Sequence, residues 1–175
     1  MGDVSADVVL RALRRTRQVR RFTDEPVDEA SIQAILEVAR WTGSSQNLQP
    51  WIFIVIRDRD VRQRIAKIAP YARHVGGAPV AIAIAMNGEN EEWDAYDEGR
   101  AAERILIAAG ALGLGGGIGW AEGPERDQIG ELLGITPPAI VRTVVSLGRP
   151  TEEERRPRTG PGTGRRPLAE LVREH

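Results

Sequence analysis

The stretch Trp51-Ile52-Phe53-Ile54-Val55-Ile56 is apolar at every position. Aromatic and β-branched residues favour strands, and a strand without polar positions is typical of the middle of a sheet, where both faces are covered. We therefore predict a central strand over residues 51–56. Val80–Met86 has the same character and predicts a second, buried strand, and Val141–Leu147 predicts a third.

Helical patterns lie around these strands. The clearest follows Asp28, a good N-cap residue, because Ile32, Ile35, Leu36 and Ala39 recur at the spacing of one helix face. The other predicted helices are Val4–Arg15, Asp60–Ile68, Arg100–Leu112 and Pro124–Leu133. Helices and strands do not alternate regularly as βαβ units, which favours an α+β fold over a doubly wound sheet.

Three segments lack such patterns. Asn87–Glu98 is acidic and polar and is predicted to be a surface connection, and Gly113–Gly119 is predicted to be a glycine-rich turn. Arg149–Arg166 is rich in Pro, Gly and Arg and cannot supply a core of its own. The apolar residues that follow it, Leu168, Leu171 and Val172, need a surface on which to dock.

Composition limits the possible functions. A chain of 175 residues can build one domain with a real core, and a net charge of −1 creates no general attraction to nucleic acid or to an anionic membrane. The absence of cysteine excludes disulfides, thiol catalysis and iron–sulfur clusters, so redox chemistry would need a bound cofactor. Residues 1–13 lack a signal-peptide pattern and no apolar run could span a bilayer, which predicts a cytoplasmic protein.

Two polar stretches contain the candidate binding residues. Arg17-Gln18-Val19-Arg20-Arg21-Phe22 clusters guanidinium groups, which suit bidentate contacts with phosphate. Gly43-Ser44-Ser45-Gln46-Asn47-Leu48-Gln49-Pro50-Trp51 adds hydroxyls and amides, and each amide offers a donor and an acceptor to the edge of a pyrimidine-like ring. Together they predict a site for a flat, polar, phosphorylated molecule.

Each stretch also has an ordinary explanation. A charge run is often a solvated face, and Ser and Asn are common in helix-to-strand connections. The cluster at Arg11–Arg21 could instead bind RNA or another anion, but the near-neutral net charge and the lack of interleaved aromatic residues beyond Phe22 weigh against it.

Other chemistries find little support. The glycine run fails as a dinucleotide fingerprint because Ile118 stands at the third glycine position and the run follows a helix. With His74 and His175 as the only histidines and no Gly-x-Ser-x-Gly elbow, a Ser-His-Asp triad is not expected. The acids of Glu89–Glu98 lack the spacing of a calcium loop, so no metal site is predicted.

Four segments, taken in order, resemble the nitroreductase family of FMN-dependent oxidoreductases. They are Arg-x-Val-Arg-Arg-Phe at 17–22, Ser-Ser-x-Asn-x-Gln-Pro-Trp at 44–51, the helix Gly99–Ala109 with the Leu-Gly-Leu-Gly that follows at 112–115, and the closing pair Val145–Pro150 and Arg165–Leu168. The resemblance runs from about Arg14 to Val172. It implies a central, mostly antiparallel sheet flanked by helices, in an intertwined homodimer that binds FMN at the subunit interface.

The resemblance also implies roles for individual residues. Residues 1–175 would form a single FMN-binding domain, with 149–175 as a tail that extends over the partner subunit. The flavin's ring edge, ribityl chain or phosphate would be contacted by Arg17, Gln18 and Arg20. The isoalloxazine would be approached, from the partner subunit, by Ser44, Ser45, Asn47 and Gln49. Backbone would come close to the ring at Gly115, Gly116 and Gly117, and the tail would bring Arg165, or else Arg166, to the phosphate.

The implied reaction is electron transfer from NAD(P)H, through bound flavin, to a nitroaromatic, quinone or similar acceptor by ping-pong turnover. The flavin carries the chemistry, and no side chain is assigned as catalytic. Two alternatives stay open: a specialised flavin reaction of the same family (dehalogenation, flavin fragmentation or a biosynthetic oxidation) and a non-catalytic flavin-binding module. Small-molecule acceptors and a second copy of the chain are the expected partners, with neither nucleic acid nor membrane.

The chain departs from the family pattern in several places. The family often has Arg where Thr16 stands, Ser where Gln18 stands and Pro where Gly43 stands. The connection at Asn87–Glu98 is short, whereas larger members have a helical excursion there that shapes the substrate channel. The active site is therefore expected to be either more open or covered by Trp93 and Tyr96.

Overall fold

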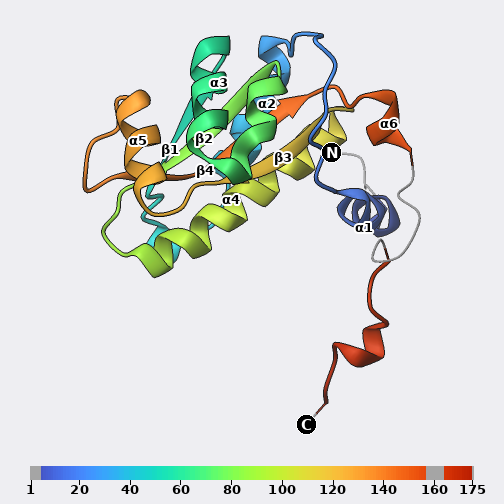
Figure 1. Cartoon of the computed structure of the whole chain (residues 1–175). Coiled ribbons are helices and arrows are strands. Elements are labelled where there is room, and N and C mark those ends of the chain that lie inside the picture. The colour runs from blue at the N-terminus through green and yellow to red at the C-terminus, as the bar shows by residue number, and fades with distance from the viewer. Residues whose placement is uncertain (1–4, 157–163, 175) are drawn as a thin grey trace.

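A computed structural model describes residues 5–156 and 164–174 (Figure 1). Its four-stranded sheet has the order β1-β2-β4-β3, and every neighbouring pair is antiparallel. The strands are β1 (Trp51–Ile56), β2 (Val80–Met86), β3 (Gly115–Trp120) and β4 (Ile140–Gly148). The α-helices are α1 (Ala6–Arg15), α2 (Glu29–Arg40), α3 (Arg59–Ile68), α4 (Glu91–Ala111), α5 (Pro124–Leu132) and α6 (Glu152–Arg155). Short 3₁₀ turns are η1 (Ser45–Asn47), η2 (Pro70–Gly77) and η3 (Leu168–Glu170). The α+β architecture with an antiparallel sheet confirms the predicted fold class.

The central strand β2 shows why the sheet is covered on both faces. All seven of its residues are buried. Val80, Ile82, Ile84 and Met86 join the core cluster formed with α2 and α4. The alternating alanines of β2 join a second cluster with α3, η2 and α5. Because side chains alternate across a strand, large residues fill one layer and small residues admit close packing in the other.

The predicted central position of residues 51–56 is wrong, because β1 is an edge strand that pairs only with β2 in this sheet. Helices cover both faces even at this edge: Phe53 and Val55 pack against the α2–α4 cluster, and Ile54 packs against the other. Ile52 is 60% exposed. An apolar run therefore indicates that both faces of a strand are covered, but it does not show whether the strand lies at the edge or in the centre of the sheet.

Two segments predicted to be irregular are regular, and those predictions are wrong. The acidic stretch continues into α4, which starts after Asn90, whose side chain accepts a hydrogen bond from the Trp93 backbone N–H at 3.0 Å. The glycine run forms β3 instead of a turn. Glycines are suited to this strand because Val19 lies against it: the Val19 N–H donates to the Gly116 carbonyl at 2.7 Å.

The remaining helix predictions are confirmed. The Asp28 carboxylate caps α2 by accepting from the Ser31 N–H at 2.8 Å. Residues 149–156 lie against the Arg17–Phe22 turn of the same chain, through a bridge between Phe22 and Pro150 and a hydrogen bond from the Thr23 N–H to the Arg149 carbonyl. Residues 164–174 are exposed throughout and lie apart from the sheet in Figure 1.

We predict that Gly117→Ala destabilises the fold by about 1–3 kcal/mol, the usual cost of overpacking. A Cβ at Gly117 would stand 2.5 Å from the Val19 carbonyl oxygen, a backbone atom that cannot move without separating the turn from β3. Chemical denaturation of purified variants measures the effect. Gly99→Ala is the control, because a Cβ at this exposed position in α4 meets nothing within 4 Å and alanine favours a helix. Equal stabilities of the two variants would contradict the prediction.

Candidate functional site

A large cavity opens beside the Arg17–Phe22 turn. It measures about 650 Å³, and its polar side is formed by Arg15, Arg17 and Arg155. Leu106 and Leu114 contribute an apolar wall. Arg17 is positioned by the segment after β4, because its guanidinium donates to the carbonyl oxygens of Glu154 and Arg156. The arginines thus come from two segments far apart in the sequence and meet around one space.

Gln18 joins this turn to β3. Its Oε1 accepts a hydrogen bond from the Ile118 N–H at 2.6 Å, and its backbone forms a parallel bridge with Gly116. Arg20 is exposed, and its backbone N–H donates to a Glu154 carboxylate oxygen at 3.4 Å. The structure therefore brings Arg17 and Gln18 together with the strand that contains Gly115, Gly116 and Gly117. A Cβ at any of these glycines would collide with Val19 or Leu106, so the packing of the chain itself accounts for the glycines.

The polar loop has an unusual backbone. Gln46, Asn47 and Gln49 have φ values of 48°, 58° and 51°. Non-glycine residues rarely occupy this region, and such strain is often found in ligand-binding segments. Side chains accept two of the hydrogen bonds that hold the loop. The Gln49 N–H donates to Ser44 Oγ at 2.8 Å, and the Ser45 N–H donates to an Asp97 carboxylate oxygen at 3.1 Å.

The two polar stretches lie at opposite ends of α4. The loop is attached near the start of α4 through Asp97. Gly110 and Ala111, at the end of α4, line the cavity formed by Arg15, Arg17 and Arg155, which we call the arginine cavity. At 1.5 Å per residue, the thirteen residues from Asp97 to Gly110 span roughly 20 Å. One chain therefore does not bring Ser44, Ser45, Asn47 and Gln49 to the arginine cavity. In the tail, Arg165 and Arg166 are exposed, and the contact of Arg166 is an ion pair with Glu170.

The start of α4 borders a second, smaller cavity. Trp93 lines it together with residues of the polar loop. Tyr96 is 76% exposed and lies outside the lining. Of the two aromatic residues expected to cover the active site, Trp93 thus lines this cavity and Tyr96 does not.

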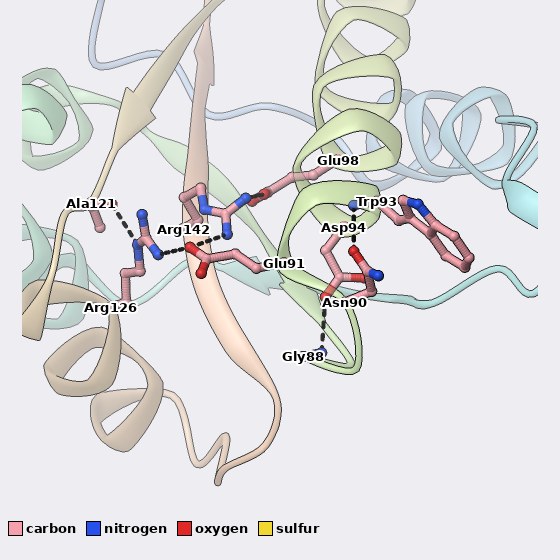
Figure 2. Close-up of polar contacts among 9 residues, drawn as sticks. All are labelled: Gly88, Asn90, Glu91, Trp93, Asp94, Glu98, Ala121, Arg126 and Arg142. Atoms are coloured by element: carbon pink, nitrogen blue, oxygen red, sulfur yellow. Dashed lines mark hydrogen bonds and ion pairs between the residues drawn. The ribbon is translucent and has the colours of Figure 1, made fainter.

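A buried charge network behind this cavity was not predicted from the sequence. Arg142, in β4, is 1% exposed and reaches Glu91 at 3.1 Å and Glu98 at 3.4 Å (Figure 2). Arg126 of α5 pairs with the same Glu91 carboxylate at 2.5 Å. The guanidinium of Arg142 also lies 5.5 Å from the centre of the Trp120 ring. A sequence signal did exist, because Arg142 is the one charged residue in the strand Ile140–Gly148.

Glu98 is strongly perturbed by this environment. Burial raises the pKa of its carboxyl to about 7, although the neighbouring Thr143 and the positive charge of Arg142 act in the opposite direction. Protonation of Glu98 therefore falls within the neutral pH range.

His74 has a structural setting. Its Nδ1 lies 2.7 Å from Ser146 Oγ, and its Nε2 lies 3.3 Å from the Ile118 carbonyl oxygen. Desolvation lowers the pKa of the imidazole, and the nearby positive charge of Arg20 adds to the effect, so the neutral form is favoured. His74, in η2, thus contacts β3 through Ile118 and β4 through Ser146.

The described residues contain no group of three or more His, Cys, Asp or Glu side chains that could hold a metal ion. Among the same residues, none of the helices has the length and apolar character needed to cross a membrane.

Comparisons with known proteins identify the family and the fold of this chain. The model of the nitroreductase family matches residues 13–72, which include both polar stretches. A protein of Methanothermobacter thermautotrophicus, provisionally named NADH dehydrogenase/NAD(P)H nitroreductase, is 34% identical over 157 residues, covering 86% of this chain and 82% of its own. An FMN reductase [NAD(P)H] of Bacillus subtilis is 28% identical, with 82% and 66% covered. The solved structure of an FMN-dependent nitroreductase from Clostridium difficile R20291 superposes with a TM-score of 0.76 at 26% identity, over 81% of this chain and 87% of that one.

We predict that Glu98→Gln changes how stability depends on pH. Because folding raises the pKa of Glu98 from 4.5 to about 7, the folded state favours the protonated acid. The stabilisation is complete below pH 4.5 and is lost as pH rises through 7, by up to about 3 kcal/mol at 1.36 kcal/mol per pKa unit. The free energy of unfolding of Glu98→Gln, minus that of the unchanged protein, should therefore increase between pH 4.5 and 8. Glu131→Gln, on the exposed face of α5, is the control. A difference that stays flat across this range would refute the prediction.

Proposed function

The chain belongs to the nitroreductase family, and on that premise we propose that it is an FMN-dependent oxidoreductase that uses NAD(P)H to reduce electron-poor acceptors. The observation that carries the proposal is the arginine cavity, because its shape and charge suit a flat phosphorylated cofactor. Nitroaromatics and quinones are the proposed acceptors, reduced by ping-pong turnover in which oxidised nicotinamide leaves before the acceptor binds.

The cavity fits FMN in size and in chemistry. A space of about 650 Å³ lies within the range of small-molecule sites. Arg15, Arg17 and Arg155 offer charged donors suited to a phosphate, and Leu106 and Leu114 offer an apolar surface suited to the flavin ring. Bound FMN would supply the hydride and electron chemistry that a chain without cysteine and without a metal-binding group in its described part does not have.

The protein's own residues have positioning roles in this proposal. Arg17 is held in the cavity by two backbone carbonyls, so its charge is oriented before a ligand arrives. Gln18 accepts from the Ile118 N–H and His74 Nε2 lies at the Ile118 carbonyl oxygen, so both side chains keep β3 in place beside the turn. Arg20 and the tail residues Arg165 and Arg166 remain proposed phosphate or flavin contacts.

We propose further that each site is built from two subunits. The polar loop lies roughly 20 Å along α4 from the arginine cavity of its own chain, so it can complete only the site of a second copy. The apolar residues Val8, Val9, Leu10 and Leu13 of α1 are exposed in the single chain. Leu168, Leu171 and Val172 of the tail are also exposed, and a partner subunit would cover both groups.

The cofactor assignment predicts that Arg17→Ala weakens FMN binding about 10- to 100-fold, the usual cost of losing a charged hydrogen-bond donor. Arg17→Lys should give an intermediate loss, because it keeps the charge and loses the planar fork. Titration of apoprotein with FMN, followed by flavin fluorescence, measures the dissociation constants. Arg14→Ala is the matched control, since Arg14 is an exposed arginine of α1 outside the cavity. Arg20→Ala should also bind FMN less tightly than Arg14→Ala. Equal FMN affinities of Arg17→Ala and Arg14→Ala would contradict the assignment of the arginine cavity as the FMN site. A purified protein that binds no FMN would contradict it as well.

The two-subunit site predicts complementation between inactive variants. Arg17→Ala/Arg20→Ala damages one half of the site and Ser45→Pro/Asn47→Ala damages the other. After the two proteins are mixed and allowed to exchange subunits, about a quarter of the unchanged activity should return, since half the dimers are mixed and each has one intact site. Steady-state NADH oxidation with a quinone measures recovery, and size-exclusion chromatography confirms dimers. No recovery after proven subunit exchange would place both halves of the site in one chain.

A further inference from the structure

The smaller cavity lies between the polar loop and the first turns of α4. Its volume is about 220 Å³, and its walls include Leu48 and Pro50 of the loop and Asn90, Trp93 and Asp94 of the helix start. A cavity of about 150 Å³ can hold a benzene molecule. The space therefore suits one substituted aromatic ring and is too small for a whole cofactor.

The charged groups that line this cavity all have the same sign. They are the carboxylates of Glu89, Asp94 and Asp97, and none of the lining residues is basic. The nearest arginines are already paired: Arg100 binds Asp97, and Arg142 binds Glu91 and Glu98. Figure 2 shows Arg142 and its partners on one side of the start of α4, with Trp93 pointing away from them.

Asp94 is the most informative of these acids. It is 3% exposed, yet it lines the cavity. One carboxylate oxygen, Oδ2, accepts from the Gly88 N–H at 3.0 Å, and the other has no hydrogen bond to the described residues. Oδ1 is not fully enclosed by protein atoms, so a donor from solvent or from a ligand can reach it. A buried carboxylate oxygen without a donor is costly unless a ligand or solvent donor meets it.

Trp93 adds an aromatic surface to this acidic space. It is 51% exposed and lines the cavity, as Leu48 does. The face of an indole attracts cations as well as flat rings. Glu89, on the rim, is exposed and has no ion pair with the described residues.

We propose that this cavity binds the electron acceptor and favours flat aromatic acceptors that carry a positive charge over anionic ones. The inference rests on the proposed function, because the loop that would cover the flavin also forms one wall of the cavity through Ser45 and Leu48. The aromatic ring of the acceptor stacks on Trp93, and its ammonium group meets Glu89 and the unpaired oxygen of Asp94. For a quinone the overall reaction is balanced as NADH plus one proton plus quinone giving NAD⁺ plus hydroquinone.

The first experiment measures binding without turnover. Phenyltrimethylammonium and benzenesulfonate, neither of which is reduced, are titrated into FMN-loaded protein by calorimetry at low salt. The ammonium probe should bind at least 10-fold more tightly, and the difference should shrink as salt is added because charge attraction is screened. Glu89→Gln should lose about 3-fold or more of this preference, and Trp93→Ala should weaken the ammonium probe. Glu131→Gln, an exposed acid outside the cavity, should leave both affinities unchanged. Equal binding of the two probes would overturn the inference.

The second experiment connects the cavity with turnover. Quinones of matched reduction potential, bearing a trimethylammonium group, a sulfonate or no charge, are compared by kcat/KM with NADH saturating. The cationic quinone should be preferred, and Glu89→Gln should raise its KM by a larger factor than the KM of the uncharged quinone. Glu131→Gln, outside the cavity, should leave the kinetics of all three quinones unchanged. If all three quinones are reduced equally well, the inference fails and the proposed function stands. If the ammonium probe binds but no quinone is reduced, the proposed function fails, and the cavity is not an acceptor site.

Discussion

The length of α4 is the constraint on which the rest of this structure depends. The helix runs from Glu91 to Ala111 and contacts α2, the sheet and the Arg17–Phe22 region. From Ala101 to Ala109 its inner face is Ala, Ile and Leu, and this half of the helix packs against the sheet. A straight, buried helix is a rigid spacer. Whatever is attached at its two ends is therefore held roughly 20 Å apart within one chain.

The start of α4 is fixed by charge instead of by apolar packing alone. Arg142 and Glu98, each about 1% exposed, form a buried pair, and Glu91 links Arg142 to Arg126 on α5. A buried ion pair adds little net stability compared with apolar residues, but removing one partner leaves a costly isolated charge. The pair therefore favours one placement of the helix start over alternatives. The same helical turns hold the polar loop, since Asp97 accepts from the Ser45 N–H. They also hold the connection after β2, where Asp94 accepts from the Gly88 N–H.

Much of the fold could be predicted from local patterns. The strand Val80–Met86 was predicted with its observed bounds, and the Asp28 cap placed α2 correctly, because each is determined by neighbouring residues in the chain. The wrong secondary-structure predictions lie where contacts between residues far apart in the sequence determine the structure. The acids of residues 87–98 look solvated in sequence, but several are buried because backbone donors and Arg142 meet them. The glycine run looks like a turn, but the close approach of Val19 makes it a strand. Likewise, the arginines and the polar loop could be identified as candidate binding residues, but their separation along α4 is visible only in three dimensions.

The two cavities at the ends of α4 are lined by side chains of opposite charge. Arginines surround the cavity at its end, while the cavity at its start is lined by acids, in a chain whose net charge is only −1. Under the proposed arrangement of two subunits, the basic end of one chain meets the polar loop and acidic cavity of the other. A composite site would then have one wall that binds phosphate and another that repels it. Such a division would hold the phosphorylated cofactor in a single orientation, with its phosphate at the arginines and its ring toward the acidic cavity. It would also give the acceptor a part of the site where a second anion is disfavoured, so that the charges that orient the cofactor and those that select the acceptor come from different chains.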